Sequence, residues 1–138
     1  MAAEVPVAVY PAMLVGTMVG SFVGMGLDVA LGSRSLWSLL ACSVVLEALV
    51  GARYAAARMG EPLTPVQRRR LSIHYSLALV SLSLPTWVWL TSSRVGRLEL
   101  PSVSLLEAGL AVLGVVAGTA ARYGLMGLFS PAPSRRPA

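Results

Sequence analysis

The chain has 138 residues, of which 56% are hydrophobic and only 12% are charged, and its mean hydropathy is +0.73. A soluble domain carries about 25% charged residues, so this composition disfavours a soluble enzyme and is typical of an integral membrane protein. The net charge of +5 comes from 11 arginines without any lysine. Because these arginines flank apolar stretches, we interpret them as topology signals and lipid-headgroup contacts, and we expect no nucleic-acid partner.

Four apolar stretches are each long enough for a helix to cross a bilayer, which needs about 20 residues. The expected spans cover about 5–27, 36–57, 71–91 and 103–128. Together they predict an all-α, integral membrane four-helix bundle over residues 1–129. Residues 130–138 are predicted to be a flexible cytoplasmic tail.

The first span carries a glycine at every fourth position, namely Gly16, Gly20 and Gly24. Helices in lipid associate through close packing and interhelical hydrogen bonds, and small residues four apart let two backbones approach each other. The fourth span has the same spacing at Gly114 and Gly118. We expect both faces to pack against another helix, either within the bundle or in a homodimer. The motif predicts contact and says nothing about chemistry.

Glu47 lies near the middle of the second span, where a charged acid costs on the order of 2.5–3.5 kcal/mol. It must therefore be protonated, paired or exposed to a wet cavity. One interpretation is a buried hydrogen-bonding clasp to His74, Ser81 or a hydroxyl of another helix. The other is a proton- or cation-binding acid in a small transporter. Glu107, about one turn inside the outer end of the fourth span, is a further membrane-embedded polar candidate.

The longest connection leads into the third span with a helix-start signal. Thr64 and Gln67 have the spacing of a capping box, and Pro65 fits the first helical position. We therefore expect the third helix to begin near Thr64. Around this start we expect lipid-headgroup contacts or topology anchors at Arg58, Arg68, Arg69 and Arg70.

The distribution of arginine predicts the orientation. Eight arginines lie on the side of both termini and three on the other side, so both termini should be cytoplasmic. The tryptophans fall at the opposite ends of the spans from the tyrosines, as expected for aromatic belts at the two interfaces.

Signatures of catalysis and of metal binding are missing from the sequence. Cys42 is the only cysteine, so an internal disulfide and a cysteine zinc cluster are excluded. Glycine-rich phosphate loops, nucleophile elbows and the HExxH zinc motif do not occur either. We therefore expect neither an enzyme nor a bound cofactor or metal.

The segment EALVGARYAAARMGEPLTPVQRRRLSIHYSLALVSL, residues 47–82, resembles a family of small four-span bacterial inner-membrane proteins of unassigned function. The positions that match the family pattern are Pro62, Leu63, Thr64 and Arg68, and those that depart from it are Glu61 and Gln67. The resemblance implies a multi-pass protein of the bacterial inner (cytoplasmic) membrane, and it supplies no activity.

These observations favour a non-enzymatic polytopic membrane protein that acts through helix–helix contacts, as an accessory, scaffold or immunity-type subunit. Its expected partners are the lipid bilayer and either a second copy or another membrane protein. The alternative is a small, dimeric proton- or cation-coupled transporter that uses Glu47.

Overall fold

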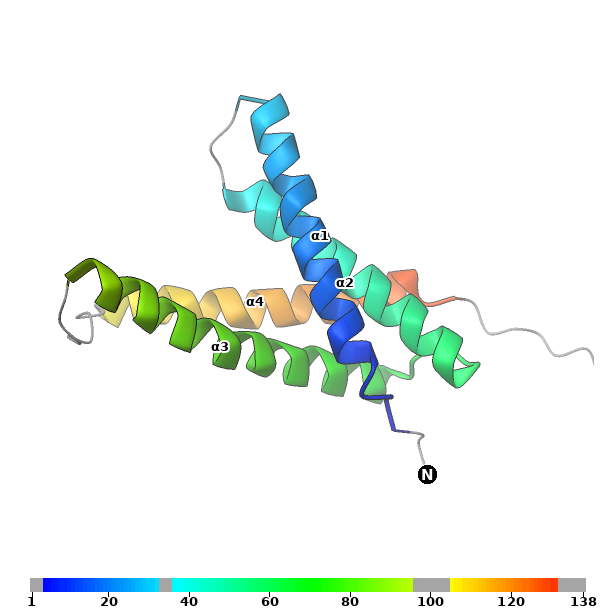
Figure 1. The fold of residues 1–138 in the computed structure, drawn as a ribbon. Helices are drawn as coiled ribbons and strands as arrows, with labels where there is room; N and C mark the ends of the chain where they lie inside the picture. Colours follow the sequence, from blue (N-terminus) through cyan, green and yellow to red (C-terminus); the bar gives the residue numbers. More distant parts are fainter. Residues whose placement is uncertain (1–3, 33–35, 96–104, 132–138) are drawn as a thin grey trace, which may run out of the picture.

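The computed structural model describes residues 4–32, 36–95 and 105–131. Over these residues the protein is all-α, as predicted, with four helices in chain order (Figure 1). The helices are α1 (Val9–Ala30), α2 (Leu36–Met59), α3 (Pro65–Val95) and α4 (Leu105–Phe129). The expected tail lies almost entirely outside the described residues.

Three helical segments are long and apolar enough to cross a membrane, by length and composition. They are Val9–Ala30, Trp37–Met59 and Ala108–Phe129. Helix α3 is not among them over the described residues. The third span therefore stays a prediction, while the other three apolar helices indicate a membrane protein.

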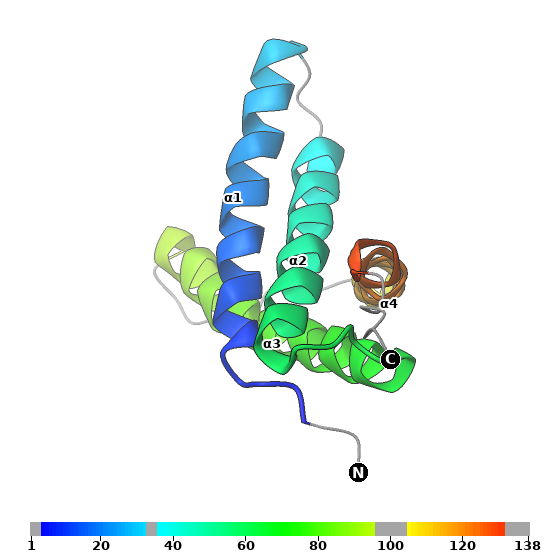
Figure 2. The same cartoon turned by 90° about the vertical axis from the view of Figure 1, so that its right-hand side faces the viewer.

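The helices are not all aligned with one another (Figures 1 and 2). Helices α1 and α2 make a hairpin, whose two members run side by side in Figure 2. Helix α4 is seen from the side in Figure 1 and nearly end-on in Figure 2, whereas α1 is seen from the side in both. Helix α4 thus crosses α1 steeply. The four axes do not share one direction, in contrast to the aligned rods expected from four spans of one bilayer.

The α1–α2 hairpin is held together by the glycine face of α1. Gly16, Gly20 and Gly24 are all buried. A Cβ atom at Gly20 would lie 2.7 Å from the carbonyl oxygen of Cys42, and one at Gly24 would lie 2.8 Å from that of Ser38. Only glycine allows backbones to approach this closely. The predicted contact face of α1 is therefore occupied within the chain by α2.

Helix α3 begins at Pro65, and the capping box predicted from the sequence is confirmed. The backbone N–H of Thr64 donates to the side-chain oxygen of Gln67 at 2.8 Å, and the Gln67 N–H donates to the Thr64 hydroxyl at 3.3 Å. These bonds satisfy two backbone donors that a helix start otherwise leaves without a partner.

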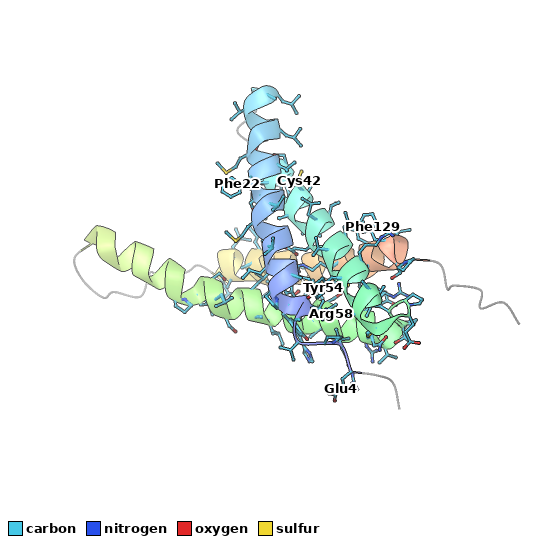
Figure 3. All side chains as sticks on the ribbon, turned by 45° about the vertical axis from the view of Figure 1, so that its right-hand side comes forward. Glu4, Phe22, Cys42, Tyr54, Arg58 and Phe129 are labelled. Carbon is cyan, nitrogen blue, oxygen red and sulfur yellow. The ribbon has the colours of Figure 1, made fainter. Side chains whose placement is uncertain are left out.

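The packed core lies toward the end of the α1–α2 hairpin that carries Tyr54 and Arg58, which Figure 3 places opposite the end with Phe22 and Cys42. Its buried apolar members include Met13, Leu71 and Met126. The first half of α4 is different, because every described side chain from 105 to 117 is exposed. All four helices therefore meet at one end of the hairpin, which is where the polar site lies.

Candidate functional site

The site is built around a buried ion pair between α2 and α4. The Nε–H of Arg122 donates to Oε2 of Glu47. Glu47 is 1% exposed and Arg122 is 8% exposed. Removing a charge from water is costly, and a buried carboxylate is stable only when a cation and hydrogen bonds replace its hydration. Arg122 supplies that cation from α4, and it lies 75 residues after Glu47 in the chain.

The second oxygen of Glu47 is bonded through α1. The Thr17 hydroxyl lies 2.8 Å from Oε1 of Glu47 and 2.5 Å from the hydroxyl of Tyr75 on α3. Thr17 sits between Gly16 and Gly20, so the glycine contacts that bring α1 close to α2 also carry this hydroxyl to the acid. The Tyr75 ring lies beneath the Arg122 guanidinium, with Cζ 5.5 Å from the ring centroid.

The guanidinium of Arg122 is held from its other side by α3. Its Nη1–H donates to the Ser76 hydroxyl at 2.8 Å, and Ser76 in turn lies 2.7 Å from the hydroxyl of Thr119. Thr119 and Arg122 are one turn apart on α4 and so share a face. The clasp, as we name Thr17, Glu47, Tyr75, Ser76, Thr119 and Arg122, therefore joins all four helices by side-chain hydrogen bonds.

Of the three kinds of partner that the sequence suggested for Glu47, two are not observed, namely His74 and Ser81. His74 is exposed, and its Nδ1 lies 3.3 Å from the Tyr10 hydroxyl, which connects α3 to the start of α1. Ser81 is exposed and does not bond to Glu47. The third suggestion, a hydroxyl of another helix, corresponds to Thr17. The side chain of Glu107 lies outside the described residues.

Sequence reasoning missed Arg122 as the counterion. It lies seven residues before the end of α4, at a depth of about 10 Å. An arginine at that depth usually extends its side chain toward the interface, so its position alone does not indicate a buried counterion. One signal could have identified Arg122. Glu47 is an acid within a membrane span, and such an acid needs a cation from another span. The sequence could not show that the crossing of α4 over α2 brings Arg122 to it.

The small residues of α4 face open space. A Cβ atom at Gly114 would meet nothing within 4 Å, and one at Gly118 would meet only Nη1 of Arg122 at 3.5 Å. Both glycines line a groove of about 640 Å³ between α2, α3 and α4. Ala111 and Ala121 complete this surface, which we call the α4 small-residue face (Ala111, Gly114, Gly118 and Ala121).

The four arginines predicted as anchors behave in different ways. Arg69 and Arg70 are exposed, and Arg58 donates to the hydroxyl of Tyr54 on its own helix at 3.0 Å. Arg68 instead lies along α4, with its guanidinium against Gly127 and 5.4 Å from the ring centroid of Tyr123.

The comparisons with known proteins add no assignment. No protein-family model, curated protein or solved structure matches the sequence. In the described parts of the chain, no three histidine, cysteine or acidic side chains come together as a metal site would require. The described residues of the site form one ion pair with hydroxyl neighbours.

Proposed function

We propose that the protein is a non-enzymatic, multi-pass membrane protein that works by presenting the α4 small-residue face to a helix of another membrane protein or of a second copy. Both termini are cytoplasmic in this proposal, and the resemblance of residues 47–82 favours a bacterial inner membrane. The role is that of an accessory, scaffold or immunity-type subunit.

One observation carries this proposal: α1 and α4 both have glycines four apart, and only those of α1 are covered within the chain. The α1 glycines contact the backbone of α2, whereas Gly114 has nothing within 4 Å. A helix in lipid gains stability from close contact, which a strip of small residues makes possible. The clasp supports the same conclusion. Glu47 is paired with Arg122 and hydrogen-bonded by Thr17, which is the arrangement expected of an acid with a structural role.

A cross-linking experiment in the native membrane tests the proposal. A photoreactive side chain at Ala117, which lines the groove, should capture a neighbouring helix, and one at Leu113, which does not, should capture far less. Gly114→Leu should abolish the Ala117 adduct. Gly109→Leu is the matched control, because Gly109 also has nothing within 4 Å but does not line the groove. Equal adducts in both variants would contradict the proposal.

The steep crossing of α4 over α1 has a consequence for the membrane. Helices α1 and α4 cannot both follow the bilayer normal in the arrangement of Figures 1 and 2. If all four spans lie in one bilayer, at least one of these helices is therefore strongly tilted from the bilayer normal.

A second candidate function is a small transporter that uses Glu47 for proton or cation coupling. It is favoured by one observation, that Arg122 and Ser76 line the groove of about 640 Å³ while also belonging to the clasp. Displacement of Arg122 by a substrate would free Glu47 to bind a proton. If this function is correct, Glu47→Gln will abolish a substrate-dependent proton flux in proteoliposomes while the protein still folds.

A further inference from the structure

A second, smaller groove runs between α3 and α4 alone. Its volume is about 400 Å³, and apolar side chains make most of its wall, which also includes Ser76 and Thr119. From α3 the wall has Ile73 and Leu77, and from α4 it has Val115, Val116 and Ala120. A long, apolar slot of this kind suits one hydrocarbon chain.

Positive charge is concentrated at one end of this groove. Arg69 lines it and is exposed, and Tyr123 lines the same end from α4. The neighbouring Arg68 lies over the Tyr123 ring, and its Nε is buried without a hydrogen-bond partner. Within the described ranges the one ion pair is Glu47–Arg122, so no carboxylate there neutralises Arg68, Arg69 or Arg70.

The length of the groove matches one leaflet of a bilayer. Arg69 and Leu77 are eight residues apart on α3, which corresponds to about 12 Å along the helix axis. Half of a hydrocarbon core is about 15 Å thick. A chain that fills the slot therefore places its polar head beside the arginines, at the level where headgroups lie.

We propose that this groove binds an acidic phospholipid, with one acyl chain between α3 and α4 and the phosphate at Arg69 and Arg68. The proposal rests on the membrane location proposed above. Guanidinium groups bind phosphate through paired hydrogen bonds, and the exposed Arg69 lines the groove while the guanidinium of Arg68 lies beside it over the Tyr123 ring. Arg69 and Arg68 favour an acidic over a zwitterionic lipid, by about fivefold in affinity for each arginine that lies beside the headgroup.

The test is a binding titration of the full chain in a neutral detergent, followed by native mass spectrometry. The probes are dioleoyl phosphatidylglycerol, dioleoyl phosphatidylcholine and glycerol phosphate. We expect phosphatidylglycerol to bind at least tenfold more tightly than phosphatidylcholine. Glycerol phosphate should not compete, because it has no acyl chain to fill the slot. Competition by glycerol phosphate would mean that the site recognises a free phosphate anion and would overturn the proposal.

Variants separate the groove from general surface charge. Arg69→Gln should weaken phosphatidylglycerol binding about fivefold. Arg70→Gln removes one positive charge from the adjacent residue. Because Arg70 does not line the groove, this variant should change binding less than twofold. Ala120→Phe fills the slot at constant charge and should weaken binding at least fivefold, and Val116→Trp provides a second filling variant if the first fails to fold.

Two results would overturn the lipid site: equal losses of binding in the two arginine variants, or unchanged binding in both filled variants.

These outcomes are distinguishable from failure of the proposed function. Loss of the lipid preference with an intact Ala117 cross-link would remove the lipid site alone. Extraction of the protein from membranes by salt without detergent would remove the membrane location on which both depend.

Discussion

Replacing Gly20 by alanine tests whether α1 and α2 depend on backbone contact. The new Cβ would lie 2.7 Å from the Cys42 carbonyl oxygen and 2.8 Å from the Ser43 nitrogen. Carbon atoms normally approach other heavy atoms to about 3.5–4.0 Å, so the overlap is about 0.7 Å or more. All the contacted atoms are backbone, so the helices must separate. Overpacking of this kind costs about 1–3 kcal/mol.

A matched variant isolates that steric cost. Alanine in a helix is favoured over glycine by about 1 kcal/mol, which would partly hide the effect at Gly20. Gly26 lies on the same helix, and a Cβ atom there would meet nothing within 4 Å, so Gly26→Ala keeps the gain without the overlap. The difference in free energy of unfolding between the two variants is therefore the steric term, and we expect it to be about 1–3 kcal/mol.

The assay is unfolding of the purified protein from mild-detergent micelles by titration with a denaturing detergent. Gly24→Ala should resemble Gly20→Ala, since its contacts are equally close. Gly16→Ala should be milder, because its nearest contact is the Leu46 carbonyl oxygen at 3.0 Å. A Gly20→Ala protein as stable as Gly26→Ala, or a loss at Gly16 larger than at Gly20, would refute the close approach of α1 and α2.

Three further predictions concern the clasp, the α3 cap and the topology. Thr17→Val keeps the volume and removes the hydroxyl between Glu47 and Tyr75, so it should lower the free energy of unfolding by about 1–3 kcal/mol in the same titration. Thr64→Ala, which removes the N-cap hydroxyl, should cost about 0.5–2 kcal/mol and speed amide hydrogen exchange in the first turn of α3, with no change in α1. In a Cys42→Ala background, an impermeant maleimide added to intact cells should label a cysteine at Gly32. It should label one at Glu61 only after permeabilisation, and the reverse pattern would refute cytoplasmic termini.

Much of the fold could be predicted from the sequence because membrane helices are specified by local composition. The stretches predicted at about 36–57 and 103–128 correspond to α2 and α4 with ends that differ by two residues or fewer, and the start of α3 was predicted from three residues, Thr64, Pro65 and Gln67. These signals depend on hydropathy and on bonds between near neighbours in the chain. They need no knowledge of how the helices pack.

The relative placement of the helices could not be predicted in the same way. The crossing of α4 over α2 depends on contacts between residues far apart in sequence, of which Glu47 and Arg122 are the main example. Hydropathy gives the depth of each residue along its own span and carries no information on crossing angle. Arg122 was therefore not recognised as the counterion, and Glu47 was assigned His74, Ser81 or a hydroxyl of another helix as possible partners.

The measurement that tests the central claim most directly is a double-mutant cycle on Glu47 and Arg122. Because arginine cannot lose its proton, Glu47→Gln should leave a buried cation unpaired and lower the free energy of unfolding by about 3–5 kcal/mol. Arg122→Gln should cost less, since the acid can be neutralised by a proton.

If the two side chains form the clasp, the double variant will lose no more stability than Glu47→Gln alone, because the second change removes the unpaired charge left by the first. Losses that simply add would contradict the account, since they would mean that the carboxylate and the guanidinium do not contact each other in the folded protein.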